Sequence, residues 1–216
     1  LPEGYQTNGA PYPLIVYLHG QGDLGNGSTD LPLLLDTALP KYIHDGRFPN
    51  SFTVSGQTHR FIVISPQFAA WPVAGDVEAV INYAVGSYNV NPQRIYVTGM
   101  SMGGGATWDY AGSSTTASRR LAAIVPVCGA STPTSTAANN ISATDLPVWA
   151  THNDQDPMVS VSNTNGFVDL INSGAPTPPA KKTIFPVVGH DAWTTTYNPA
   201  FEENGLNIYE WMLQYQ

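Results

Sequence analysis

The sequence predicts an α/β fold, with a mostly parallel central sheet and helices on both faces. Short apolar runs, such as LIVYL at 14–18, alternate along the chain with helical patterns, such as 76–88. This alternation is typical of right-handed parallel crossovers. The strand runs are apolar throughout, which indicates a sheet covered on both sides. Residues able to carry chemistry follow the strands directly, as expected where sites form at the carboxyl ends of parallel strands.

Each expected element rests on a local pattern. Strands are assigned to the apolar runs, and the helix at 76–88 to apolar residues at helical spacing. The helix at 102–111 follows a glycine-rich turn, and the one at 206–215 is amphipathic. Two stretches lack such patterns: 20–50 is rich in Gly, Pro and Asp, and 130–146 is polar. We expect the second to be a surface loop or small cap, and both to shape substrate access. The strands are expected at 14–18, 61–65, 94–98, 122–128, 148–151 and 183–187, and the helices at 76–88, 102–111, 161–172 and 206–215.

Length and composition narrow the function classes. A chain of 216 residues fits one domain, 1–216. With 8 basic and 16 acidic residues the net charge is -8, which argues against nucleic acid as a partner. No apolar run approaches the roughly 18 residues of a membrane span. Charged residues make up only 11% of the chain, and residues with hydroxyl and amide side chains take their place. This composition is typical of secreted or periplasmic proteins. Because the chain starts at Leu1, we expect a mature chain or a domain from a longer secreted protein.

The candidate nucleophile is Ser101, in the sequence Gly-Met-Ser-Met-Gly at 99–103. This G-x-S-x-G pattern lies between the predicted strand RIYVT and a predicted helix, as a nucleophile elbow requires. A sharp strand-to-helix turn exposes the serine oxygen, and glycines permit the close backbone approach. The loop has neither the lysine nor the spacing of a phosphate-binding loop.

The candidate base is His190, one of five histidines. A serine hydroxyl needs a general base at neutral pH, and His190 follows the last predicted strand in the chain order Ser, acid, His. His44 and His59 precede the serine in polar loops, so we expect them at the surface. For His19 and His152, which follow strands, we expect structural roles.

The candidate acid is Asp156, which follows a strand and precedes a helix between the serine and the histidine. Asp154 stands two residues nearer the strand and stays an alternative, although it could instead stabilise the turn. We expect Asp145 and Asp169 at the surface, and Asp191 to cap or rim the site.

Backbone N–H groups are expected to stabilise the oxyanion. Met102 supplies one at the start of a helix, and Gln21 supplies the second in the glycine-rich turn after the first strand. Gln67, Trp71 and Trp193 follow strands or the candidate base and could line the substrate pocket; the two tryptophans could equally be packed residues.

We expect no metal and no cofactor, because no His/Cys cluster has the spacing of a ligand set. The single cysteine, Cys128, lies in the apolar run AAIVPVCGA and is predicted to be a small buried hydrophobe.

Taken together, these motifs resemble bacterial secreted esterases of the α/β-hydrolase superfamily. The branch is that of the carboxylesterase/phospholipase-like and "predicted peptidase" proteins, close to feruloyl esterases and polyhydroxybutyrate depolymerases. The resemblance implies an α/β-hydrolase fold, the triad Ser101, Asp156 and His190, and oxyanion groups from Gln21 and Met102. It covers nearly the whole chain and rests on YPLIVYLHGQGDLGNG, FIVISPQ, VTGMSMGGGATWDYA, AAIVPVCGA, THNDQDPMV and GHDAW.

Two positions depart from this family's pattern. The family usually has H-G-x-x-D before the acid, whereas here Asn153 replaces the glycine. Asparagine tolerates left-handed backbone better than most residues, so the turn could survive. The family often has glutamate after the first glycine-rich turn (HGxGE), where this chain has the shorter Asp23.

The expected activity is hydrolysis of carboxylic esters through an acyl-enzyme on Ser101. The substrates are expected to be small-molecule or polysaccharide esters, with acetyl or feruloyl groups of plant polysaccharides first among them. A polyester depolymerase or a peptidase of the same fold is an alternative. A non-catalytic carbohydrate- or polymer-binding module on a hydrolase scaffold is the alternative from another class.

Overall fold

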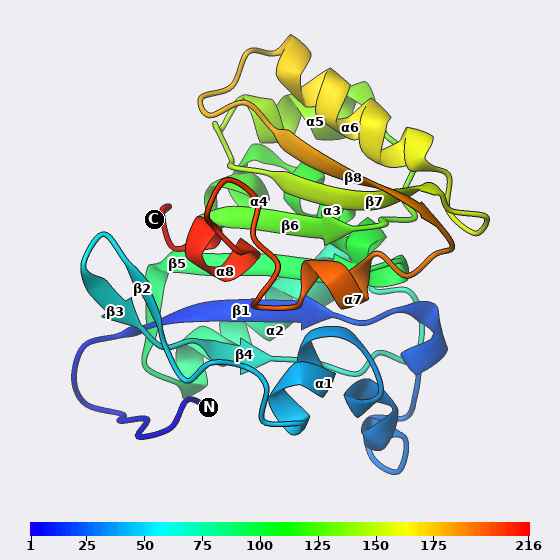
Figure 1. Cartoon of the computed structure of the whole chain (residues 1–216). Helices are drawn as coiled ribbons and strands as arrows, with labels where there is room; N and C mark the ends of the chain where they lie inside the picture. Colours follow the sequence, from blue (N-terminus) through cyan, green and yellow to red (C-terminus); the bar gives the residue numbers. More distant parts are fainter.

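A six-stranded sheet in the order β4-β1-β5-β6-β7-β8 runs through the centre of the molecule (Figure 1). It is described by a computed structural model that covers residues 1–216. Every neighbouring pair of its strands is parallel. The strands are β1 (Tyr12–Leu18), β4 (Ile62–Ile64), β5 (Val90–Met100), β6 (Ala123–Val127), β7 (Trp149–Gln155) and β8 (Lys181–Val188). A separate hairpin joins β2 (Phe52–Val54) and β3 (Gln57–His59).

Helices cover both faces of the sheet, and alternate residues of β1 are buried against opposite layers. On one face Leu14 and Val16 of β1 pack with α2, α3, α5 and α6, and on the other Ile15 and Tyr17 pack with α1 and α8. All four of these β1 side chains are at most 1% exposed, which explains why the run reads as apolar throughout. The helices are α1 (Ala38–His44), α2 (Ala74–Ser87), α3 (Met102–Ser113), α4 (Thr115–Arg119), α5 (Ser135–Ser142), α6 (Val161–Ser173), α7 (Trp193–Thr196) and α8 (Ile208–Met212).

The predicted α/β class and the parallel sheet are confirmed, with two corrections to the elements. The stretch 130–146 is not a loop or cap, because it contains α5, whose Ala138 and Ile141 are fully buried. The predicted helix at 206–215 is shorter, because Asn207 caps its start and α8 ends at Met212. The irregular stretch 20–50 holds two short 3₁₀ turns, η1 (Gln21–Asp23) and η2 (Leu31–Leu35), as well as α1.

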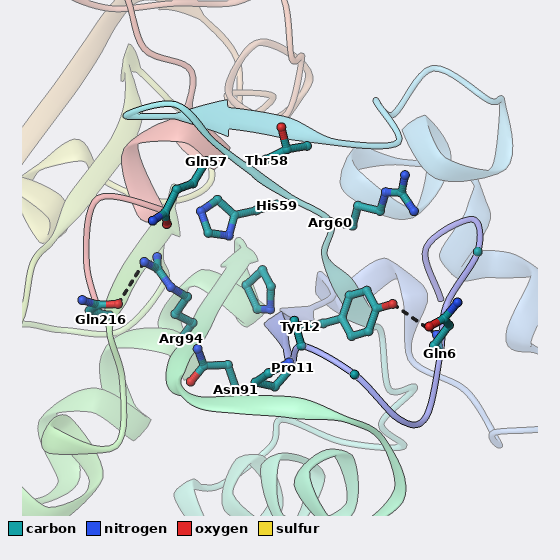
Figure 2. A pocket seen from close by; sticks show the side chains of 14 residues that line it. Gln6, Pro11, Tyr12, Gln57, Thr58, His59, Arg60, Asn91, Arg94 and Gln216 are labelled. Carbon is teal, nitrogen blue, oxygen red and sulfur yellow. Dashed lines mark hydrogen bonds between the residues drawn. The ribbon is translucent and has the colours of Figure 1, made fainter.

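The largest cavity, about 900 Å³, lies at the amino-terminal ends of β1 and β5 (Figure 2). Tyr12, His59 and Arg94 are among the residues that line it, and Figure 2 shows their side chains around the hollow. Its lining includes no Asp or Glu side chain and neither serine nor cysteine. It therefore lacks a nucleophile of the serine or cysteine type and an acid to orient a base, so the chemistry predicted from the sequence must lie elsewhere. None of the helices has the length and apolar character needed to cross a membrane.

Candidate active site

A second cavity, of about 450 Å³, opens at the carboxyl ends of the strands. Ser101 stands directly after β5, His190 two residues after β8, and Gln21 three residues after β1. All three line this cavity. Because the strands are parallel, their carboxyl ends meet at one edge of the sheet and bring these distant segments together.

Ser101 sits on a strained turn between β5 and α3. Its φ of 54° and ψ of -114° are rare for a residue with a side chain. The turn is held by its own backbone: the Ser101 N–H donates to Val127 at 2.9 Å, and the Ser101 carbonyl accepts from Gly105 at 2.9 Å and from Ala130 at 3.0 Å. Backbone groups of β6, of α3 and of the segment after β6 thus fix the serine in a conformation that the isolated chain would not favour.

Gly103 lets the elbow approach β1. A Cβ at Gly103 would collide with the carbonyl group of Leu18, which is backbone of a buried central strand and cannot move aside. We expect Gly103→Ala to lower the free energy of unfolding by about 1–3 kcal/mol or more, as overpacking does in close-packed interiors. Chemical denaturation measures this loss. The control is Gly86→Ala in α2, where the added methyl meets nothing within 4 Å; an equal loss there would contradict the explanation.

The imidazole of His190 lies between the other two predicted residues. Its Nε2 is 2.8 Å from Oγ of Ser101, and its Nδ1 is 2.6 Å from Oδ2 of Asp156. A carboxylate only accepts hydrogen bonds, so Nδ1 carries the proton and Nε2 is free to accept from the serine hydroxyl. The His190 side chain is 19% exposed, whereas the Asp156 side chain is fully buried. The imidazole is therefore partly accessible to solvent, and its carboxylate partner is not.

Asp156 is held as a carboxylate. Its Oδ1 accepts from the backbone N–H of Met158 at 2.8 Å and of Val159 at 3.0 Å. Burial alone would raise the pKa of this carboxyl, but the hydrogen bonds from His190 and from those two amides lower its pKa below the ordinary value. The alternative acid, Asp154, is exposed, and its side chain contacts only the amide of Gln155, at 3.4 Å. The structure therefore brings Asp156, and not Asp154, to His190.

Three of the other four histidines, His19, His44 and His59, form no hydrogen bond with Ser101 or Asp156. His44 is exposed and His59 is half-buried at the other end of the sheet. His19 is buried and ties two loops together: its Nδ1 is 2.7 Å from the Gly20 carbonyl, and its Nε2 accepts from the Phe68 N–H at 2.9 Å. The loop that carries Gln21 is fixed in this way.

The cavity walls include four of the five other predicted site residues: Gln21, Met102, Trp71 and Trp193. Trp193 meets the His190 ring edge to face, with centroids 5.2 Å apart.

Gln67 is the fifth, and the prediction that it lines the pocket is wrong. Its amide nitrogen donates to the carbonyls of Asp23 at 3.1 Å and Asp30 at 2.8 Å, and its oxygen accepts from Gly27 at 3.0 Å. It is absent from the cavity lining because it holds the loop at 23–30.

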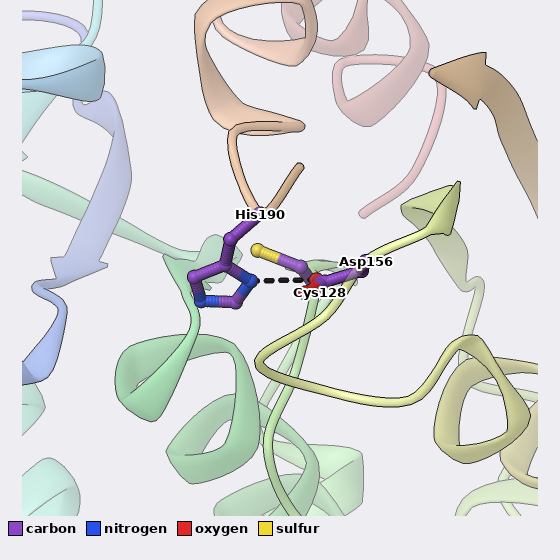
Figure 3. Close-up of side chains that lie close together, drawn as sticks. All are labelled: Cys128, Asp156 and His190. Atoms are coloured by element: carbon purple, nitrogen blue, oxygen red, sulfur yellow. Dashed lines mark hydrogen bonds and ion pairs between the residues drawn. The ribbon is translucent and has the colours of Figure 1, made fainter. Parts of the chain in front are cut away.

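The side chain of Cys128 lies close to those of Asp156 and His190 (Figure 3). Its sulfur and the nearest donor atoms of Asp156 and His190 lie within 4.8 Å of one another. The two latter groups are already bonded to each other, and burial raises the pKa of the Cys128 thiol, which disfavours the thiolate that metals bind. This trio therefore fits a metal poorly.

Sequence comparison decides the family. The chain matches the dienelactone hydrolase family over residues 60–210, a segment that contains Ser101, Asp156 and His190. The chain belongs to the dienelactone hydrolase family. It is therefore an enzyme of the hydrolase class. No curated protein sequence matches it.

Solved structures with the same fold as this dienelactone hydrolase family member include esterases. A thermostable esterase superposes with a TM-score of 0.71 at 23% identity, covering 100% of this chain but only 57% of its own. A feruloyl esterase module from Clostridium thermocellum gives 0.60 at 16% identity, covering 88% and 75% of the two chains. A Klebsiella pneumoniae protein described as a dienelactone hydrolase gives 0.58 at 13%, covering 95% and 85%. These likenesses confirm the α/β-hydrolase fold.

Sequence reasoning missed two polar side chains that brace the site of this dienelactone hydrolase family member. Asn153, 2% exposed, donates from Nδ2 to the carbonyl of Gly189 at 2.8 Å. Gly189 has a φ of 114° and directly precedes His190, so the asparagine fixes the start of the histidine loop. Asp109, the second, accepts from the hydroxyl of Ser131 at 2.7 Å. The signal for Asn153 was its replacement of the glycine in H-G-x-x-D.

Two histidines are expected to make the folded protein less stable in mild acid. The pKa of His152 is lowered chiefly by burial, and that of His59 by burial and by Arg94, from an ordinary 6.5. Below about pH 6.5 these two histidines therefore bind protons more readily in the unfolded chain than in the folded chain. Stability should fall as pH drops toward 5, by at most about 1.4 kcal/mol per pH unit for each histidine. Urea unfolding at several pH values measures this, and a stability that is flat or rises across this window would contradict it.

His59→Gln is the control for this pH dependence. It should remove part of the slope between pH 6.5 and 5, because glutamine does not titrate. Carboxyl groups such as Asp23, whose pKa burial raises from 3.8, act in the opposite direction and favour the folded chain as pH falls.

Proposed function

We propose that this member of the dienelactone hydrolase family is a serine esterase that forms an acyl-enzyme on Ser101. One observation carries the proposal: a hydroxyl, an imidazole and a buried carboxylate stand in one hydrogen-bonded line, with separations of 2.8 Å and 2.6 Å. A nucleophile bonded to a base, which is in turn oriented by a third group, is the arrangement that activates a serine.

The reaction would proceed in two steps, acylation of Ser101 and hydrolysis of the acyl-enzyme. Oγ of Ser101 attacks the ester carbonyl carbon while its proton passes to Nε2 of His190. The tetrahedral intermediate collapses, the bond to the alcohol oxygen breaks, and His190 returns the proton to the departing alcohol. Water then attacks the acyl-enzyme with the same proton movements and releases the acid and the free serine. Asp156 holds the imidazole in the required tautomer and stabilises its positive charge.

Two backbone N–H groups are suited to the oxyanion. Met102 is the first residue of α3 and Gln21 the first of η1, so neither N–H has a partner within its own helical turn. Both residues line the cavity beside Ser101. Each such donor typically contributes about 10²–10³ in rate.

The walls of the cavity favour a flat or apolar acyl group. Half of its 14 lining residues are hydrophobic, among them Trp71, Trp193 and Met158. Aromatic walls suit a sugar face or an aromatic acid. We therefore infer that the enzyme acts on acetyl or feruloyl esters of plant polysaccharides. The feruloyl esterase module from Clostridium thermocellum, which has the same fold, supports this substrate class. We also infer that residues 1–216 form one catalytic domain. The hydroxyl- and amide-rich composition supports a secreted or periplasmic location.

The test compares acetyl, feruloyl and short-chain esters with peptide anilides, together with labelling of Ser101 by phenylmethylsulfonyl fluoride. We expect ester turnover and a single labelled serine. Turnover of anilides alone would make the chain a peptidase, and release of acid only from a polyester film would make it a depolymerase. An unlabelled Ser101 with no turnover would favour a non-catalytic binding module.

A further inference from the structure

His152 lies inside the protein, in contact with the proposed acid. It stands on β7, and its side chain is as fully buried as that of Asp156. Its Nε2 is 3.2 Å from Oδ2 of Asp156 and 3.0 Å from the carbonyl oxygen of Val159. Its Nδ1 is 2.8 Å from Oγ1 of Thr164, a fully buried residue on α6. Both ring nitrogens are thus engaged.

These partners determine where the imidazole proton sits. A backbone carbonyl can only accept, so Nε2 of His152 must carry the proton. Nδ1 then accepts from the hydroxyl of Thr164, which can donate. Burial, the largest effect, lowers the pKa of His152 and keeps the ring neutral. His152 therefore presents one N–H, which donates to the Val159 carbonyl, and Oδ2 of Asp156 stands 3.2 Å from the same nitrogen.

Asp156 is consequently held on both oxygens. Oδ2 faces the two imidazoles, His190 at 2.6 Å and His152 at 3.2 Å, and Oδ1 accepts from two backbone amides. Without His152, Oδ2 would have His190 as its only partner. The carboxylate could then rotate with that imidazole instead of fixing it.

We propose that His152 is a positioning residue, whose neutral Nε2–H fixes Oδ2 of Asp156 so that the carboxylate can orient His190 toward Ser101. The inference rests on the proposed function, since it assigns His152 to the same triad. His152 does not line the cavity and so has no access to substrate. Because it is neutral, it holds the carboxylate without adding a positive charge that would compete with protonated His190.

Two substitutions of His152 test whether the N–H at Nε2, and not the size of the ring, is what the site requires. In His152→Gln the amide nitrogen can take the place of Nε2 and still donate to Asp156. In His152→Asn the shorter amide reaches only the position of Nδ1, beside Thr164. The asparagine variant should lose about 10- to 100-fold in kcat, the scale of a misplaced reacting group. Its KM should stay nearly unchanged, because substrate contacts remain. The glutamine variant should recover most of the lost kcat.

The outcomes are distinct. Parent kcat in both variants, or an equal loss in both, would overturn the proposal, because neither result depends on an N–H at Nε2. If the variants do not fold, ¹⁵N NMR of the unmodified protein replaces them: a proton on Nε2 of His152 supports the proposal, and a proton on Nδ1 alone overturns it. Failure of the proposed function looks different, because ester hydrolysis would then be absent or would persist in Ser101→Ala.

Discussion

Ser101→Ala is expected to lower kcat for ester hydrolysis by at least about 10⁴-fold. The alanine has no oxygen to form the acyl-enzyme, while His190 and Asp156 keep their mutual bond of 2.6 Å. Only activity from the oxyanion groups and from substrate binding would remain. Steady-state kinetics with a nitrophenyl ester, supported by the loss of phenylmethylsulfonyl fluoride labelling, measures the change.

The control for this variant is Ser162→Ala. Ser162 is exposed in the first turn of α6, and its hydroxyl contacts only Ser160, at 2.8 Å. It should retain parent kcat. Thermal unfolding of Ser101→Ala should stay close to that of the parent, because the backbone bonds that hold the elbow are unchanged. A folded Ser101→Ala variant with parent kcat would end the acyl-enzyme mechanism.

The strands and the elbow could be predicted because their determinants are local. A buried parallel strand such as β1 needs apolar residues on both faces, and this requirement is visible in five consecutive letters. The turn at Ser101 needs small residues two places before and after it, and Gly99 and Gly103 supply them. Chain order then indicated His190 and Asp156, which the structure brings together with Ser101.

The side chains that brace the site could not be predicted, because their partners are distant in sequence. Gln67 meets Gly27, 40 positions away, and Asn153 meets Gly189, 36 positions away. A polar residue after a strand has the same appearance in the sequence whether it faces the pocket or a neighbouring loop, which is why Gln67 was misassigned. Helix α5 was missed for a related reason: its polar residues obscure the two apolar ones that it buries.

Asp156→Asn is expected to lower kcat by about 10⁴-fold, the scale seen when the orienting carboxylate of a triad becomes an amide. An amide nitrogen facing Nδ1 of His190 would donate to it and move the imidazole proton to Nε2. That nitrogen could then no longer accept the proton of Ser101. If the amide instead turned its oxygen toward His190, its nitrogen would face the N–H groups of Met158 and Val159, which also donate. Neither orientation satisfies the site.

Asp154→Asn is the matched control, since it makes the same chemical change two residues away. Asp154 is exposed, and its only side-chain contact is the Gln155 amide at 3.4 Å. We expect kcat within about 2-fold of the parent, as for a surface change far from any network. Kinetics on both variants distinguishes the two carboxylates directly. A large loss in Asp154→Asn with parent activity in Asp156→Asn would mean that the loop rearranges in solution and that the other carboxylate orients His190.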